Sequence, residues 1–565
     1  MSSDRQSTLT SSPASASIHE DKSSPQDANN AATPELGSKL ALAPVKSAEP
    51  VYITGIKLYL VFLALSLVSF LMLLDVSIVA TAIPRITSDF HSLQDVGWYG
   101  SAYLLANCSL QPLAGKIYTY FDSKITFLGF FAIFEVGSLL CGIANSSKML
   151  IVSRAVAGLG GAGLMNGALT IISAAVPLSK RPVYMGAMMG IAQMGVVLGP
   201  LLGGAFTEYT TWRWCFYINL PIGALVAVLL IFISIPSVNV KPPGQQFFQT
   251  IYKELDLLGF VLFAPSIIML LLALEWGGST YPWKSSTIIG LFCGAAANFL
   301  VFLAWEQYVG DKAMIPLSLL KIRIVWVSGA YVFFFFSMMQ IVVYYLPIYF
   351  QAIKNTSPMM SGVDLLPSIL SQLLGTLASG AAVTKFGYYL PFAVGAAVIT
   401  SIGHGTLTLL EPDSSIGDWI GFQILVGFGR GIGMQMPYVA VQNSVSTKLM
   451  SISVSILTFT QTFGGSVFLS IAQTVFTTSL HTTIPKYAPD VSADKVIAAG
   501  ATGVWSTVTN RTDLANVLIA YNESIRRDYY IAIGCSGACF FLAWGLGWKD
   551  IRTQAKPRET SREQV

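Results

Sequence analysis

Three charged residues, Asp75, Glu135 and Arg154, fall inside long apolar stretches of the sequence. Counting from the ends of those stretches places all three in the outer half of a membrane, where they could meet. A charge at the centre of a membrane helix costs about 2.5–3.5 kcal/mol on insertion scales. Two acids beside one arginine can exchange a proton, because the cation keeps one carboxylate charged while desolvation raises the proton affinity of the other. We interpret the three as a proton-coupling site; a permanent ion network that only fixes helix packing is the alternative.

Other polar residues inside apolar stretches are candidates for a substrate cavity. Arg430 lies in the middle of a later stretch with no acid at a matching depth, so a substrate or gating role and a structural role both stay open. Amides are costly when they face hydrocarbon, so they line a cavity or bond between helices. The further candidates are Asn107, Gln111, Asn166, Gln193, Gln340, Tyr344, Gln435 and Gln461. Glu275 and Glu306 fall at the ends of their stretches, and we expect them to be solvated.

The composition excludes most other classes of protein. The chain has 565 residues, of which 53% are hydrophobic and 11% charged, and soluble domains carry about 25% charged residues. A net charge of +4 is too small for a nucleic-acid surface. The four histidines lie far apart and away from the cysteines, so we expect no metal site. No Walker-type phosphate loop occurs in the polar segments, so we expect no cofactor and an ion gradient as the energy source.

The apolar stretches predict an all-α integral membrane protein. About fourteen runs are long enough to span a bilayer, arranged as six, two and six. Residues 1–52 are polar without an apolar period and predict a disordered tail. The predicted divisions that follow are a six-helix bundle at 53–236, two linker helices with their loops at 237–324, a second six-helix bundle at 325–548 and a tail at 549–565.

The basic residues predict the orientation of the chain in the membrane. Lys and Arg are more frequent in the short loops on the side that holds both tails, which places both termini in the cytoplasm. Residues 479–528 then form one long outer loop. This loop carries glycosylation sequons at Asn510 and Asn522.

Several motifs resemble one transporter family. The run Gly195-Val-Val-Leu-Gly199-Pro200-Leu-Leu-Gly203-Gly204 resembles the antiporter signature of drug exporters of the major facilitator superfamily. Leu74–Pro84 resembles the first-helix motif of its branch with fourteen spanning helices, and Trp212–Pro221 resembles the start of its sixth helix. Phe134–Ser138 and Gly429–Gln435 resemble the fungal drug and toxin exporters of that branch. The resemblance implies the major facilitator fold, with two six-helix bundles and two extra central helices.

The loop that locks the inner gate in this family has a weak internal repeat here. Gly115 to Lys124 and Gly380 to Lys385 occupy corresponding positions in the two halves. Both copies depart from the family pattern, because Thr119 and Thr384 stand at the usual aspartate position. We take Gly115, Lys124, Gly380 and Lys385 as the gating-loop residues.

Together the residues and the resemblance predict a proton-coupled antiporter that works by alternating access. The resemblance implies export of a hydrophobic small molecule, a fungal secondary metabolite, mycotoxin or drug, by a monomer in the plasma membrane, with the vacuolar membrane as the alternative. Siderophore uptake by the same architecture stays open. A membrane enzyme lacks convergent catalytic groups, and a passive channel lacks charged rings or filter loops.

Overall fold

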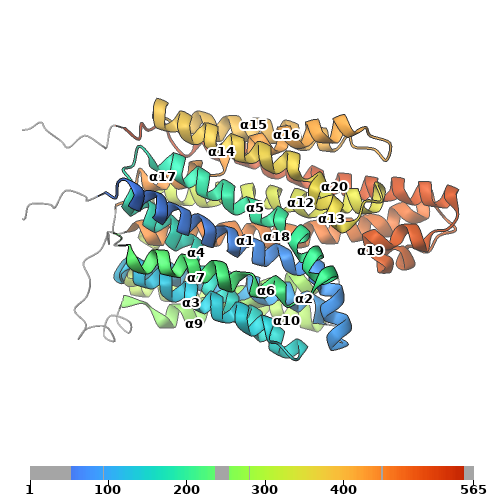
Figure 1. Ribbon diagram of the computed structural model, residues 1–565, viewed down its shortest axis with the longest axis horizontal. Helices are drawn as coiled ribbons and strands as arrows, with labels where there is room; N and C mark the ends of the chain where they lie inside the picture. Colours follow the sequence, from blue (N-terminus) through green and yellow to red (C-terminus); the bar gives the residue numbers. More distant parts are fainter. Residues whose placement is uncertain are drawn as a thin grey trace, which may run out of the picture. The chain divides into compact units, whose positions relative to one another are not determined.

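The computed structural model describes residues 52–92, 95–233, 235, 254–278, 280–446 and 449–552. Nearly all of both predicted tails, residues 237–253 of the predicted linker, and residues 234 and 236 at the end of the first predicted bundle lie outside this part. In the described residues, β-type pairing is confined to two isolated bridges, and long helices run side by side (Figure 1). The described chain starts and stops at the same side of the helices. The basic residues predict that this side faces the cytoplasm, and it is called the inner end below.

Helices occupy the six stretches that the sequence predicts for the first bundle. Its pairs of packed helices are α1 with α5, α2 with α4, and α3 with α4. Pro200 lies inside α5, as the sequence predicts for a bent helix. The helices of the first bundle are α1 (Ile56–Phe90), α2 (Val96–Tyr120), α3 (Ser123–Gly142), α4 (Ser147–Ala175), α5 (Arg181–Tyr209), α6 (Trp214–Tyr217) and α7 (Asn219–Phe232).

Two further helices, α9 (Leu257–Trp276) and α10 (Ser286–Val309), pack on each other beside the first bundle, and the short η3 (Gly310–Lys312) follows α10. The first of them also contacts α2 and α18. Glu306 was expected to be solvated, and that expectation is wrong. Its side chain is fully buried and accepts a hydrogen bond of 2.9 Å from the backbone N–H of Ile315, which the turn after α10 brings back to it.

The second bundle follows with the helix pairs α12 with α18, α14 with α16, and α15 with α20. A π-helical turn, η4, directly continues α12. The elements of the second bundle are α11 (Leu317–Leu320), α12 (Arg323–Ile348), η4 (Tyr349–Ile353), α13 (Pro358–Asp364), α14 (Leu366–Phe386), α15 (Leu390–Leu407), α16 (Ile416–Gly433), α17 (Met436–Gln442), α18 (Met450–Tyr487), α19 (Ala493–Thr507) and α20 (Arg511–Trp544).

The predicted long outer loop at 479–528 is mostly helical, so its description as a loop is wrong. Helix α18 continues to Tyr487, α19 occupies much of the middle, and α20 begins at Arg511. One predicted glycosylation site fails for the same reason. Asn522 is 7% exposed within α20, and its amide donates a hydrogen bond of 2.7 Å to the carbonyl of Leu410. Asn510 is exposed at the start of α20 and stays a prediction.

By length and apolar composition, eleven helices of the described residues can cross a membrane. Three other long helices, α2, α16 and α20, fall outside these eleven, yet each packs among them. Polar residues at the contacts between helices lower the mean hydropathy of such helices without exposing those residues to lipid. The chain is therefore a multi-pass membrane protein.

The two bundles meet along α5 with α14 and along α2 with α18. Near the inner end, a side chain added at Gly115 of α2 would overlap Ser455 of α18. One added at Gly380 of α14 would come within 2.8 Å of the Pro182 carbonyl at the start of α5. These close approaches use corresponding glycines of the two halves, so the bundles are in contact at this end.

Candidate functional site

Asp75 and Arg154 form a buried ion pair in the first bundle. The Arg154 Nη1 donates to the Asp75 Oδ2 at 2.5 Å, and the two side chains are 1% and 0% exposed. Asp75 comes from α1, and Arg154 comes from the amino-terminal third of α4. The sequence predicts this meeting from depth alone, and the structure places the two charges in direct contact.

The rest of the guanidinium is enclosed by α2. Its Nε donates to the carbonyl of Tyr99 at 2.9 Å, and its Cζ lies 4.7 Å from the centre of the Tyr103 ring. A backbone acceptor and an aromatic face both stabilise a cation away from water. The Arg154 Cζ also lies 5.8 Å from the centre of the Phe216 ring of α6, so three kinds of partner from α1, α2 and α6 hold Arg154.

Asn219 is a member of this site that the sequence analysis quoted only as part of a motif. It begins α7, and its amide nitrogen lies 3.3 Å from the Asp75 Oδ1 and 3.0 Å from the Ser138 Oγ. Asn219 is fully buried. The motif at the start of the sixth predicted span thus supplies a polar side chain to the Asp75 carboxylate. The position of Asn219 near the end of that span does not predict this contact.

Glu135 does not join the ion pair directly. It lies on α3 one turn before Ser138, and neither carboxylate oxygen has a hydrogen-bond partner among the described residues. Its carboxylate faces α7, where Gly223 leaves room for it. The three charges predicted to meet are therefore one contacting pair and one separate acid.

The glycine-rich signature of α5 lies directly against α1. Side chains added at Gly195, Gly199 or Gly203 would overlap α1 residues, whereas one at Gly204 would meet nothing within 4 Å. The Ser77 hydroxyl also donates to the Gly195 carbonyl at 3.0 Å. Helix α1 consequently joins the ion pair, through Asp75, to the signature helix.

The gating-loop residues divide into two groups. Gly115 and Gly380 lie at the contacts between bundles described above. Lys124 instead donates to the carbonyls of Ile231 and Ile233, at 2.8 and 2.9 Å, at the carboxyl end of α7. Lys385 is exposed at the end of α14. The glycines, and not the lysines, are thus placed where the two bundles touch.

Arg430 is the second buried arginine of the bundles, and its surroundings differ. It is 2% exposed on α16, and its Nη2 donates to the hydroxyl of Ser368 on α14. Its Nε and Nη1 have no hydrogen-bond partner among the described residues. No described carboxylate forms an ion pair with it.

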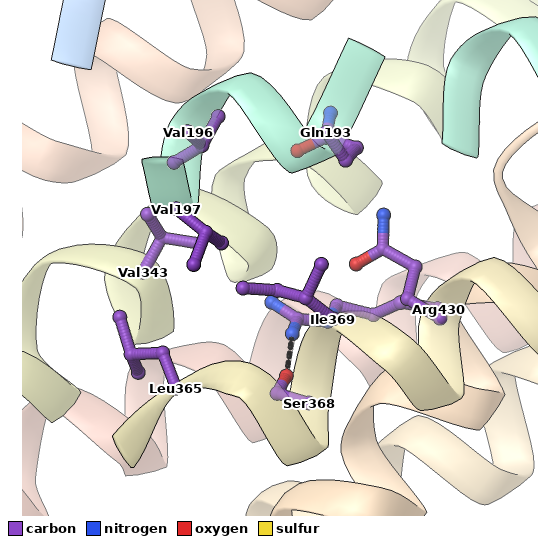
Figure 2. A pocket seen from close by; sticks show the side chains of 9 residues that line it. Gln193, Val196, Val197, Val343, Leu365, Ser368, Ile369 and Arg430 are labelled. Atoms are coloured by element: carbon purple, nitrogen blue, oxygen red, sulfur yellow. Dashed lines mark hydrogen bonds between the residues drawn. The ribbon is translucent and has the colours of Figure 1, made fainter. Parts of the chain in front are cut away.

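A small cavity lies beside Arg430 between the two bundles (Figure 2). It has a volume of about 30 Å³, which suits one or two water molecules. Helix α5 supplies one wall and the second bundle the others. The lining residues are Gln193, Val196, Val197, Val343, Leu365, Ser368, Ile369, Gln372 and Arg430.

Two of the nine residues predicted for a substrate cavity, Gln193 and Arg430, line this cavity. Gln111 instead donates to Thr462 across the α2–α18 contact at 3.2 Å, and Gln461 accepts from Tyr438 at 2.7 Å. Tyr344 is 48% exposed. The structure keeps the others away from the lining, and these are Asn107, Asn166, Gln340 and Gln435.

Asp528 of α20 is a buried acid that the sequence analysis missed. It is fully buried, and neither carboxylate oxygen has a hydrogen-bond partner among the described residues. It lies inside the stretch 479–528 that the sequence predicts as an outer loop, where an acid is expected to be solvated. Only the extension of α20 to Arg511 shows that Asp528 belongs to a packed helix.

With this geometry in place, comparison with known proteins identifies the family. The family model described as Major Facilitator Superfamily matches residues 65–469. The chain belongs to this superfamily. The fold and the resemblance inferred from the motifs are therefore confirmed.

Relatives from fungi match nearly the whole chain. The MFS-type transporter pigP of Monascus ruber is 53% identical over 91% of this chain and 90% of its own length. The efflux pump mlcE of Penicillium citrinum is 52% identical, over 90% of this chain and 93% of its own. The efflux pump aflT of Aspergillus parasiticus is 43% identical, over 89% and 97%. These relatives are transporters, and the membrane-enzyme alternative is set aside.

A solved structure supports the fold. The crystal structure of the human organic anion transporter MFSD10 (TETRAN) superposes with a TM-score of 0.51 at 12% identity, and covers 85% of this chain and 100% of that chain. At this identity the likeness concerns the architecture alone.

Proposed function

We propose that this protein exports an organic small molecule in exchange for protons by alternating access. Export is supported by relatives named efflux pumps at 43–52% identity. Proton coupling is supported by one observation above all, the buried contact of Asp75 with Arg154. Intramembrane charges of this kind commonly mark proton relays.

The proton step acts on the Asp75 carboxylate. Protonation removes its negative charge, so the attraction that holds Arg154 to α1 weakens strongly in a low-dielectric site. Asn219 and the Tyr99 carbonyl remain to satisfy the uncharged acid and the guanidinium. Loss of the proton restores the ion pair, so one titration switches the attraction between α1 and α4.

This switch has a physical connection to the contact between the bundles. Asp75 and Ser77 are two residues apart on α1, and Ser77 bonds the Gly195 carbonyl of α5. The same α5 packs against α14 of the second bundle. A movement of α1 would therefore shift α5, which it contacts directly, and so change the contact of α5 with α14. Separation of the bundles at Gly115 and Gly380 would open the inner end.

The remaining parts of the proposal concern the substrate and the membrane. We infer a moderately apolar substrate, because the cavity between the bundles combines Val, Leu and Ile side chains with Gln193, Gln372 and Arg430. We further infer a monomer that uses no cofactor and resides in the plasma membrane.

The test is transport into inside-out vesicles that contain the protein. A panel of labelled apolar organic compounds and ferric siderophores is offered to vesicles whose lumen is acidic. The measurement is repeated after an ionophore has collapsed the pH gradient. We expect accumulation of at least one organic compound that disappears with the gradient. Siderophore entry into right-side-out vesicles, with no accumulation of any compound in inside-out vesicles, would overturn export.

Asp75→Asn tests the coupling site in the same vesicles. We expect gradient-driven accumulation to disappear while membrane delivery persists. Asp75→Glu is the matched control, because it keeps a carboxylate at the site. Full gradient dependence in Asp75→Asn would contradict the proposed role of Asp75.

A further inference from the structure

Arg430 is a buried cation whose charge is not balanced nearby. Its side chain is 2% exposed, and Nη2 donates to the Ser368 hydroxyl. The Nε and Nη1 groups lack any acceptor among the described residues. Buried guanidinium groups are normally paired, because desolvating an unpaired charge costs several kcal/mol. An anionic ligand at these free donors would lower that cost.

The unpaired guanidinium lines the cavity between the bundles. Figure 2 shows it among the lining side chains, with Ser368 on the same wall. The opposite wall comes from α5 and includes Val196, Val197 and Gln193. One side of the cavity thus offers donors to an oxygen, and the other side offers aliphatic surface with one amide.

We propose that Arg430 binds an acidic oxygen of the exported compound, so that the substrates are apolar organic acids that carry a carboxylate or an ionised enol or phenol. This proposal rests on the proposed export function and adds the chemical class of the substrate. The free Nε and Nη1 donors lie on different edges of the guanidinium, and either can give an acidic oxygen one charge-assisted hydrogen bond. The valine and isoleucine side chains contact the apolar body of the same molecule.

The present conformation is closed around this site. A volume of about 30 Å³ excludes an organic acid of drug size. Separation of α5 from α14 would enlarge the cavity, because its lining comes from both helices. Ser368 then holds the guanidinium at Nη2 while Nε or Nη1 donates a hydrogen bond to the acidic oxygen of the ligand.

The test measures equilibrium binding to the purified full-length protein, with no membrane gradient. The probes are a panel of aromatic and aliphatic carboxylic acids of drug size, each paired with its own methyl ester. We expect at least one acid to raise the melting temperature more than its ester does. In Arg430→Gln we expect that acid to bind about 10- to 100-fold more weakly, the range for one hydrogen-bonded charge. The ester should bind the variant and the unaltered protein equally.

Two controls keep the result interpretable. Arg430→Lys keeps the positive charge and should retain part of the preference for the acid. Melting of each variant without ligand reports whether it folds. The proposal is wrong if no acid binds better than its ester, or if Arg430→Gln keeps the preference. Failure of export would show separately, as absent gradient-dependent accumulation in vesicles despite binding of the acid.

Discussion

The two bundles each bury an arginine in their fourth long helix, but they satisfy it in opposite ways. Arg154 lies seven residues after the start of α4, about 10 Å along the helix, and contacts Asp75. Arg430 lies fourteen residues after the start of α16, about 21 Å along it, and among the described residues its guanidinium hydrogen-bonds to one partner, the Ser368 hydroxyl. A cation with an internal acid can respond to protons, whereas a cation without one is suited to an external anion. The difference suggests that the two halves divide proton coupling from substrate recognition.

Removal of the acid from the first site should have the largest effect. Asp75→Asn leaves Arg154 buried without a counter-charge, and such losses cost about 3–5 kcal/mol of stability. The double variant Asp75→Asn/Arg154→Gln removes both charges and should recover much of the melting temperature without recovering gradient-driven transport. Thermal unfolding and vesicle transport check the two outcomes. Recovery of transport in the double variant would show that the pair only fixes helix packing.

Addition of an acid to the second site should make it resemble the first. Ser368→Asp places a carboxylate beside Arg430, so the internal charge should compete with an organic acid and weaken its binding about 10- to 100-fold. Ser368→Ala is the matched control, because it removes the hydroxyl without adding charge. The binding assay with acid and ester pairs measures both. Unchanged acid binding by Ser368→Asp would contradict the unpaired character of Arg430.

The α1–α5 contact offers a test of the connection between the sites. A side chain at Gly195 would lie 2.5 Å from the Phe70 carbonyl and 2.8 Å from the Leu74 backbone N–H. Gly195→Ala should therefore destabilise the protein by about 1–3 kcal/mol and slow transport. Gly204→Ala, on the same helix with nothing within 4 Å, should leave the melting temperature unchanged. Equal effects of the two variants would argue against close packing as the role of the signature.

An exposed ion cluster should give the smallest effect and so calibrates the buried pair. Glu523 lies in the stretch predicted as an outer loop, and it accepts hydrogen bonds from the Tyr487 hydroxyl at 2.6 Å and from Arg527 at 3.1 Å. Tyr487 first, and then Arg527 and Lys486, hold the pKa of Glu523 below its usual value. The cluster thus stabilises the folded state above the unfolded pKa of about 4.3, and loses this contribution as pH falls through the lower folded pKa.

Glu523→Gln should therefore lower the melting temperature slightly at pH 7, and the difference from the unaltered protein should vanish at pH values below the folded pKa of Glu523. Exposed pairs contribute about 0–1 kcal/mol, and added salt should reduce the difference further. A larger effect than that of Asp75→Asn would reverse the ranking of buried and exposed charges.

The sequence alone determined the membrane class and the helical spans, because apolar runs of bilayer length have few other uses. It also determined that Asp75 and Arg154 lie at similar depth, since depth follows from position along a span. The signature glycines pointed to close packing for the same local reason. These properties depend on residue type and spacing within single helices.

The tertiary structure decided which side chains meet. It brought Asn219 to Asp75 and kept Glu135 apart, because lateral position and rotation of a helix depend on its neighbours. It buried Glu306 through a turn that returns Ile315, and it extended α20 through a stretch predicted as loop. It also left Arg430 at a cavity with two free donors. Whether a buried side chain has a hydrogen-bond partner depends on how the helices pack together, so the sequence of one helix cannot show it.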